Sequence, residues 1–244
     1  MEKIISYPFS FLALLLFLLA ICIFHPIQWV CYNVFGYQAH KKSVDYLNFL
    51  LVRIGHLLGT SYKFENRKLI PKGVPIIFVS NHQSLYDIIV MIWFLRRFHP
   101  KFVSKKELAK GVPSVSYNLR VGGSAVIDRK DPKQAIPAIR NLGEYIEKHK
   151  RSAVIFPEGT RSKNGSPKEF ARTGVKLLYN AAPSAFVVPI TINNSYKFVK
   201  FGFFPFGLGK RLIFTVHNPL AVSEYSFEEI MLKTESVIVN SIKV

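Results

Sequence analysis

The hydrophobic pattern divides the chain into an apolar N-terminal part and a body in which short apolar runs alternate with helical patterns. The seventeen residues from Pro8 to Phe24 carry no charge. As a helix they span about 25 Å, slightly less than the hydrocarbon core of a bilayer. Residues 43–59 repeat apolar side chains at helical spacing: Tyr46, Phe49, Leu50, Ile54, Leu57 and Leu58. This pattern predicts an amphipathic helix that either packs on the body or lies along a membrane surface.

Three interpretations of the apolar segment compete. A cleaved signal peptide is disfavoured, because only Lys3 precedes the run and no small-x-small cleavage site follows it. A membrane-spanning anchor is favoured. The alternative is a monotopic helical hairpin that enters one leaflet and turns near His25-Pro26. Lys41 and Lys42 follow the segment, and this bias places the body on the cytoplasmic side.

From residue 61 onward the pattern predicts an α/β fold. Apolar runs predict strands at 74–80, 101–105, 124–129, 152–157, 185–192 and 211–217. Helical patterns occupy 85–98, 106–120, 131–149, 168–181 and 227–242. Asp131 followed by Pro132 is typical of a helix start, and residues 197–209, rich in Phe, Gly and Pro, are expected to form a loop. This alternation predicts a mixed, largely parallel sheet flanked by helices.

Charge and cysteine content narrow the classes of partner. The net charge is +18, and residues 61–244 account for most of it, with 29 basic and 13 acidic side chains. Such a body favours phosphates, nucleic acid or an anionic membrane surface. No nucleic-acid-binding motif is found, so the apolar N-terminus favours the membrane. The two cysteines and seven histidines show no metal-ligand spacing, and no metal or cofactor is expected.

The sharpest candidate for chemistry is the stretch NHQSLYD, from Asn81 to Asp87, where a strand gives way to a helix. If His82 precedes the helix, Asp87 in the first turn can hold one imidazole nitrogen. The other nitrogen is then free to take a proton from an alcohol. Ser84 and Asp87 also match a capping box, which would account for those two residues but not for Asn81 and His82.

Three further motifs carry candidate binding groups. The turn FPEGTRS at residues 156–162 offers backbone N–H groups, a hydroxyl and the guanidinium of Arg161, whose planar fork suits phosphate. An ordinary turn with a surface arginine is the alternative. Arg129 ends a predicted strand, either as a second phosphate clamp or as a solvated charge. Pro189 inside an apolar strand predicts an edge strand or a bulge.

Together these motifs resemble the glycerolipid acyltransferase family, most closely the 1-acylglycerol-3-phosphate (lysophosphatidic acid) acyltransferases. The resemblance covers roughly residues 60–220. In order, its motifs here are Asn81-His82-Gln83-Ser84 with Asp87, Gly123 with Ile127-Asp128-Arg129, Phe156 to Ser162, and Val188-Pro189-Ile190. The resemblance implies that His82 is the general base and Asp87 orients it. It implies acceptor binding by Arg129, Glu158, Gly159, Thr160 and Arg161, and places Pro189 on the acyl-donor side.

The resemblance also implies the activity: direct transfer of a fatty acyl group from acyl-CoA or acyl carrier protein to the free hydroxyl of lysophosphatidic acid. The chain would then comprise an anchor with its amphipathic helix, residues 1–60, and a catalytic domain, residues 61–244. Two alternatives stay open: another lyso-lipid acceptor, such as a lyso-amino-acid lipid or lysophosphatidylglycerol, and a catalytically silent protein that binds anionic lipids. One departure concerns residues 170–174, FARTG, where the family usually shows Phe-Lys-x-Gly.

Overall fold

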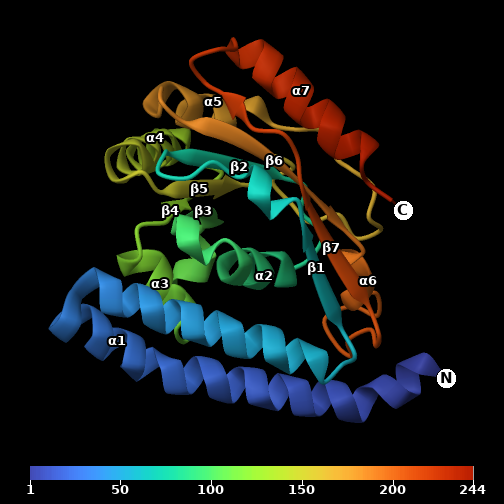
Figure 1. Ribbon diagram of the computed structural model, residues 1–244. Helices are drawn as coiled ribbons and strands as arrows, with labels where there is room; N and C mark the ends of the chain where they lie inside the picture. Colours follow the sequence, from blue (N-terminus) through green and yellow to red (C-terminus); the bar gives the residue numbers. More distant parts are fainter. Residues whose placement is uncertain (244) are drawn as a thin grey trace.

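The N-terminal helix folds back on itself as a hairpin. The structure is a computed structural model that describes residues 1–243. Helix α1 runs from Glu2 to His56, interrupted at Gly36, where φ is 77° and ψ is −170°. Only glycine adopts this backbone conformation readily, so the chain reverses there into two antiparallel limbs (Figure 1). The reversal predicted near His25-Pro26 is therefore wrong. Pro26 lies inside the first limb, and the turn comes ten residues later.

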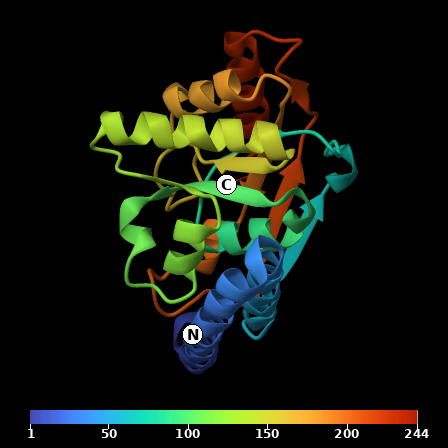
Figure 2. The same ribbon diagram turned by 90° about the vertical axis from the view of Figure 1, so that its left-hand side faces the viewer.

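The two limbs lie side by side along one side of the body (Figure 2). By length and composition α1 could cross a membrane. The second limb turns Leu47, Leu51 and Ile54 toward the core, while Tyr46 and Leu50 are exposed. Only part of the apolar face predicted for this helix is therefore buried against the body. This limb is apolar on both sides, so its periodicity alone could not identify the face that packs on the body.

Within residues 1–243 the strands form one mixed sheet. The strands are β1 Ser61–Glu65, β2 Ile76–Ser80, β3 Pro100–Lys105, β4 Ala125–Ile127, β5 Ser152–Ile155, β6 Phe186–Asn193, β7 Arg211–Val216 and β8 Leu220–Ala221. Their order is β1-β7-β6-β2-β5-β3-β4, and β8 pairs with β6. All neighbours are parallel except the β6–β7 and β6–β8 pairs, which are antiparallel. The predicted mixed, largely parallel sheet is confirmed.

Helices cover both faces of this sheet (Figures 1 and 2). They are α2 Tyr86–Phe94, α3 Val115–Val121, α4 Pro132–His149, α5 Arg172–Ala181, α6 Ser195–Phe198 and α7 Phe227–Asn240, with short 3-10 turns at Arg67–Leu69, Arg96–Phe98 and Lys106–Ala109. The α1 hairpin and α2 lie over one face, and α4, α5 and α7 over the other. Alternate residues of β2 point to opposite faces of the sheet. Phe78 packs in the cluster that includes Leu47 and Leu51 of α1, and Ile77 packs in the cluster formed with α4, α5 and α7.

Pro189 lies in a central strand, so the predicted edge strand is wrong, but the alternative prediction of a bulge is confirmed: residues 188–189 of β6 face three residues, 217–219, of the segment that joins β7 to β8. Strand β6 is flanked by β2 on one side and by β7 and β8 on the other. Strand β8 pairs with residues 186 and 187, and β7 pairs with residues 190–193. Pro189 falls in the interval between these two partners, where its carbonyl accepts from the N–H of His217 at 3.0 Å. A residue without an N–H is tolerated there because no ladder bond requires one.

Candidate active site

His82 stands directly beyond β2, at the end of the sheet where its parallel strands finish. Helix α2 begins four residues later at Tyr86. The imidazole ring stacks on Phe156, which follows β5, with 4.1 Å between the ring centroids and 16° between the planes. The His82 side chain keeps 12% of its surface exposed, whereas Asp87 is completely buried. The ring is thus held on one side and open to solvent or substrate on the other.

Asp87 orients this ring, as the sequence predicted. Its Oδ2 accepts from Nδ1 of His82 at 2.9 Å and from the backbone N–H groups of Gln83 and Ser84 at 2.7 and 2.8 Å. Its Oδ1 accepts from the hydroxyls of Ser84 and Ser195. When Nδ1 donates to the carboxylate, the neutral ring presents the lone pair of Nε2 to an incoming proton. No residue among 1–243 forms a hydrogen bond with Nε2.

The predicted capping box forms only in part. The N–H of Ser84 donates to the carboxylate of Asp87, as a capping box requires. The hydroxyl of Ser84, however, accepts from the N–H of Tyr86 rather than from that of Asp87. One carboxylate therefore binds the N–H groups that precede α2 and also orients the histidine, although α2 has no side-chain cap at its N-cap residue, Leu85. The two interpretations of this motif are compatible.

The neighbours of His82 in the motif have positioning roles that the sequence did not indicate. The amide of Asn81 donates to the carbonyl of Ile192 at 2.8 Å and accepts from its N–H at 2.7 Å, so it prolongs the pairing of β2 with β6. The Gln83 side chain accepts from the N–H groups of Ser195 and Tyr196 at 2.9 and 3.4 Å. Both residues therefore join the histidine segment to β6 and α6.

The turn at residues 156–162 lies against the main chain of His82. Oε1 of Glu158 accepts from the N–H of His82 at 3.1 Å, and the N–H of Ser162 donates to the His82 carbonyl at 2.7 Å. Gly159, with φ of 68°, turns its carbonyl toward the guanidinium of Arg129, which donates to it. The structure therefore brings Arg129 and the turn residues together beside the histidine, although 30 residues separate Arg129 from Gly159.

Lys168 is a basic residue of this turn that the sequence analysis missed. Its Nζ donates to the hydroxyl of Thr160 at 2.7 Å and to the carbonyl of Arg161 at 3.2 Å. Arg172, the basic residue in the departure from the family pattern, pairs instead with Glu228. Lys168 lies two positions before Phe170, so the only signal in the sequence was a lysine next to the expected motif.

Glu158 is the carboxyl group with the most unusual environment in the site. Burial raises its pKa to about 7, although the hydrogen bond from the His82 N–H opposes this rise. Its Oε2 is buried and has no hydrogen-bond partner among residues 1–243. Buried polar oxygens are rarely left unpaired. This oxygen is therefore an unpaired acceptor in the buried wall of the site.

Three other residues of the predicted motifs, Arg161, Pro189 and Gly123, lie in different surroundings. The side chain of Arg161 is exposed and forms no hydrogen bond with residues 1–243. Pro189 lines a cavity of about 290 Å³ with residues that include Val216, His217 and Lys233. Gly123 has φ of 89° and precedes β4. Residues 1–243 include no cluster of three or more His, Cys, Asp or Glu placed to hold a metal ion, and the expectation of a metal-free, cofactor-free reaction remains a prediction.

A His–Asp pair with a buried carboxylate and a partly open ring, beside a basic turn at the end of a largely parallel sheet, is typical of enzymes that take a proton from a hydroxyl group. The profile of the Acyltransferase family matches residues 61–193, more than half of the chain. This chain belongs to that family, and the resemblance drawn from its motifs is confirmed.

Relatives agree with this placement, and one solved structure shares the fold. A 1-acyl-sn-glycerol-3-phosphate acyltransferase of Helicobacter pylori is 34% identical over 124 residues, 50% of this chain and 49% of that protein. The human 1-acyl-sn-glycerol-3-phosphate acyltransferase alpha is 29% identical over 158 residues, 64% of this chain and 54% of that protein. The chain thus spans about half the length of these relatives. The crystal structure of the 1-acyl-sn-glycerophosphate acyltransferase PlsC from Thermotoga maritima has the same fold, with a TM-score of 0.77 over 98% of this chain and 95% of that one, at 23% identity.

Proposed function

We propose that this chain is a 1-acyl-sn-glycerol-3-phosphate O-acyltransferase that acylates the free hydroxyl of lysophosphatidic acid to give phosphatidic acid. The observation that carries the proposal is the 2.9 Å pair of His82 and Asp87 beside the turn to which Arg129 donates. The pair supplies a base, and the turn supplies groups suited to a phosphate. The names of the matched relatives support lysophosphatidic acid as the acceptor.

In this reaction Nε2 of His82 takes the proton of the acceptor hydroxyl while the oxygen attacks the carbonyl carbon of the thioester. The new C–O bond forms, the C–S bond breaks, and the imidazolium returns the proton to the leaving thiolate. Asp87 stabilises the transient imidazolium through the bond to Nδ1. Direct transfer needs no covalent enzyme intermediate, and the sequence has no Gly-x-Ser-x-Gly nucleophile motif.

The turn next to His82 supports binding of the acceptor's phosphate. The backbone N–H groups of Thr160 and Arg161 have no hydrogen-bond acceptor among residues 1–243. They are therefore available to anionic oxygens, as are the guanidinium of Arg161 and the ammonium of Lys168. Glu158, whose Oε1 accepts from the N–H of His82, holds this turn against the base and so helps to align the acceptor with it.

We further propose that the α1 hairpin lies in one leaflet, with the body on the cytoplasmic side. Polar contacts tie the first limb to the body along its length. The hydroxyl of Ser114 donates to the Ile21 carbonyl at 2.6 Å, and Asn33 donates to the hydroxyl of Tyr117 at 2.9 Å. A limb that left the body to span the bilayer would lose these bonds. This supports the monotopic alternative, with its turn at Gly36.

An acyl-transfer assay tests the proposed function. The full chain in detergent or vesicles is given one acyl-CoA, or the matching acyl carrier protein thioester, and a panel of acceptors: lysophosphatidic acid, lysophosphatidylglycerol and a lyso-amino-acid lipid. Lysophosphatidic acid is expected to give the highest kcat/KM. Preference for an acceptor without a phosphomonoester would establish the other lyso-lipid function instead. No transfer to any acceptor would favour a silent lipid-binding protein.

A further inference from the structure

The loop between α6 and β7 carries aromatic side chains that the proposed reaction does not use. We call residues 199–210, VKFGFFPFGLGK, the aromatic loop. Phe206 is buried, but Phe203 keeps 70% of its surface exposed. A single exposed apolar side chain is ordinary. What matters is whether Phe203 belongs to a larger apolar surface.

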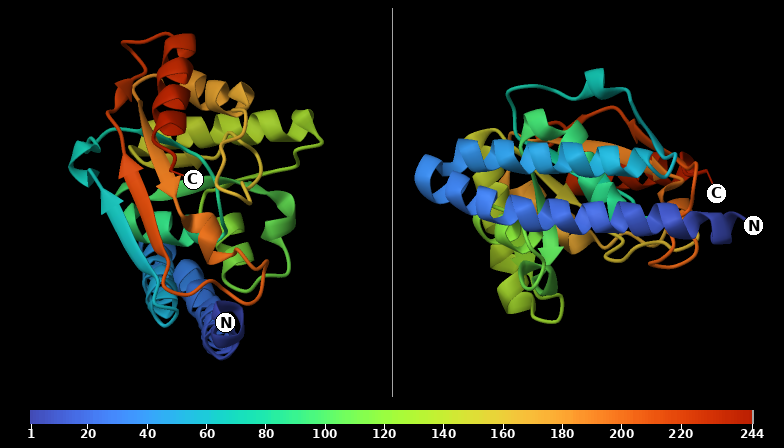
Figure 3. Two further views of the ribbon diagram at one scale, coloured as in Figure 1. Left: turned by 90° about the vertical axis from the view of Figure 1, so that its right-hand side faces the viewer. Right: turned by 90° about the horizontal axis from the view of Figure 1, so that it is seen from below.

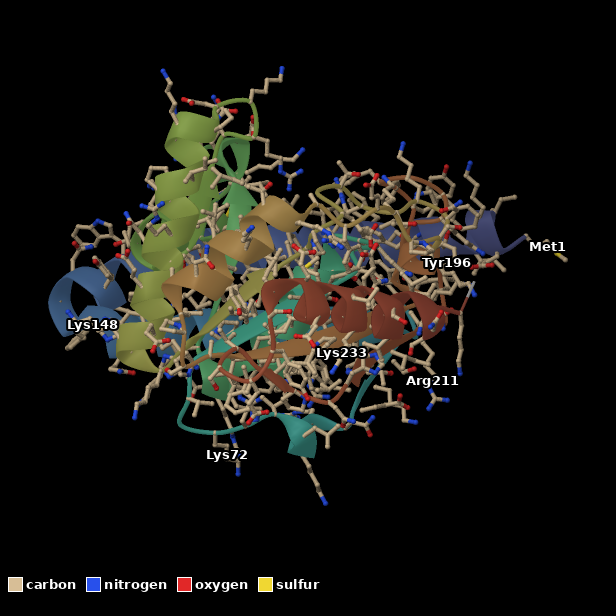
Figure 4. The ribbon with its side chains drawn as sticks, turned by 90° about the horizontal axis from the view of Figure 1, so that it is seen from above. Met1, Lys72, Lys148, Tyr196, Arg211 and Lys233 are labelled. Atoms are coloured by element: carbon tan, nitrogen blue, oxygen red, sulfur yellow. The ribbon has the colours of Figure 1, made fainter. Side chains whose placement is uncertain are left out.

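The aromatic loop docks on the first turns of α1. The rings of Phe204 and Tyr7 meet edge to face, with centroids 5.5 Å apart. The N–H of Phe206 donates to the hydroxyl of Ser10 at 2.9 Å. In Figures 1 and 3 the loop descends beside the N-terminal end of the hairpin, and Figure 4 places Tyr196 of α6 at the same end of the molecule as Met1.

The neighbouring part of α1 is strongly apolar and exposed. Its outward side chains near the loop include Ile4, Ile5, Phe9, Phe11 and Leu12, of which Ile4 is 75% and Phe11 65% exposed. This face continues along the first limb, which carries no charged side chain from residue 4 to its end at Gly36. Phe203, which precedes the residue that contacts Tyr7, therefore adds an exposed aromatic side chain beside the apolar surface of the candidate membrane helix.

Cationic side chains flank the aromatic loop. Lys200 and Lys210 form ion pairs with Glu2 at 2.6 and 3.1 Å, and Lys197 lies on α6 just before the loop. Two of these lysines therefore fix the loop to the start of α1, and the group as a whole is positively charged. Aromatic side chains next to lysines are typical of segments at the interface of an anionic bilayer.

The aromatic loop is also connected to the active site through α6. Phe198, the last residue of α6, is buried against Tyr86, with ring centroids 4.0 Å apart. Ser195, the first residue of α6, donates to the carboxylate of Asp87. A lipid surface in contact with the loop would therefore lie one short helix away from the catalytic pair.

We propose that the aromatic loop inserts into the same anionic lipid leaflet as the outward face of α1, with Phe203 as the inserted side chain. An anionic lipid leaflet is the partner that fits this loop, because the loop adjoins the apolar face of α1 and because lysines lie next to its aromatic side chains. The inference rests on the membrane attachment proposed above and is independent of the acyl-transfer reaction. The contact of the loop with the leaflet, in addition to that of α1, places the entrance to the active site at the lipid interface, where a lyso-lipid acceptor resides.

Fluorescence quenching tests the insertion directly. Trp29 and Trp93 are replaced by Phe, and a single tryptophan is placed by Phe203→Trp or, in the control chain, by Leu232→Trp. Leu232 matches Phe203 in exposure, at 68%, but lies on α7 at the opposite side of the molecule. In vesicles of phosphatidylglycerol with brominated acyl chains, the tryptophan at 203 is expected to be quenched and the one at 232 not. Equal quenching at both positions would overturn the proposal. So would a blue shift at 203 that grows with protein concentration without vesicles, because it would indicate a second copy as the partner.

A kinetic measurement on the otherwise natural chain covers the case in which the tryptophan variants do not fold. Phe203→Ser is expected to lower the rate on lysophosphatidic acid embedded in vesicles about tenfold, the loss typical of an aromatic side chain that is no longer buried. The rate on a short-chain, monomeric acceptor is expected to stay unchanged, and Leu232→Ser should alter neither rate. An equal loss on both acceptors would mean a structural role and would refute insertion. If the parent acylates neither acceptor, the proposed function fails, and the quenching result still decides the insertion.

Discussion

The backbone N–H of Ser162 donates a 2.7 Å hydrogen bond to the carbonyl oxygen of His82. The N–H of His82 in turn donates to Glu158, at the other end of the same turn. The residue proposed as the base is therefore held through its main chain by the segment proposed to bind the acceptor's phosphate. The proposed hydroxyl and phosphate sites are thereby fixed relative to each other, which is the arrangement that catalysis by positioning requires.

Replacement of the proposed base is the most direct test of the reaction. His82→Ala is expected to lower kcat by about 10²–10⁴-fold, the usual contribution of a positioned general base. His149→Ala, on the exposed end of α4, serves as the control and should leave kcat unchanged. Circular dichroism checks that both variants fold. Activity of His82→Ala within a few fold of the parent would remove this residue from the mechanism.

Ser195 is expected to position the base through Asp87, because its hydroxyl donates to Oδ1 of that carboxylate. Loss of one hydrogen bond to a charged group should reduce kcat about tenfold, with KM unchanged. Ser195→Ala should show this loss, and Ser195→Thr, which keeps the hydroxyl, should recover most of it. Ser152→Ala provides the control: Ser152 is equally buried and bonds the carbonyl of Phe98, outside the site. Equal kcat losses in the two alanine variants would point to a general effect on folding.

The stability of the protein should depend on pH through Glu158. Burial raises its pKa from 4.5 to about 7, so the folded state binds the proton more readily than the unfolded state. Stability therefore falls as the pH rises from about 4.5 to about 7 and the carboxyl group ionises. Glu158→Gln removes this loss, so its Tm relative to the parent should be higher at pH 8 than at pH 5. Glu169→Gln, an exposed change on the same loop, should show no such trend; a pH-independent difference for Glu158→Gln would contradict the prediction.

Arg161 is expected to contribute to acceptor binding and not to donor binding. Arg161→Lys keeps the charge but loses the planar fork, so KM for lysophosphatidic acid should rise roughly tenfold or more. KM for acyl-CoA should stay the same. Arg172→Lys, which alters an arginine paired with Glu228 away from the site, is the matched control. A rise confined to the KM of acyl-CoA would assign Arg161 to the donor site.

Most strands of the sheet were predictable because parallel strands buried on both faces appear as continuous apolar runs. Strand β1, SYKFE, was missed because it is only half buried, and β8 is too short for any periodicity. The hairpin turn was placed too early. A proline inside a helical pattern resembles a break, whereas Gly36 reveals its role only through its backbone angles. For Pro189 the sequence left an edge strand and a bulge open, because it does not show that two different strands share one side of β6.

The sequence by itself determined the α/β class, the apolar N-terminal segment and the pairing of His82 with Asp87, because each depends on residues close together in the chain. Tertiary structure decided which groups surround that pair. Ser195 reaches Asp87 across 108 residues, and Arg129 reaches Gly159 across 30. It also decided that Lys168, and not Arg172, joins the turn. Such contacts arise where strands far apart in the chain end at the same edge of one sheet, and strand order is a property of the packed fold rather than of any local pattern.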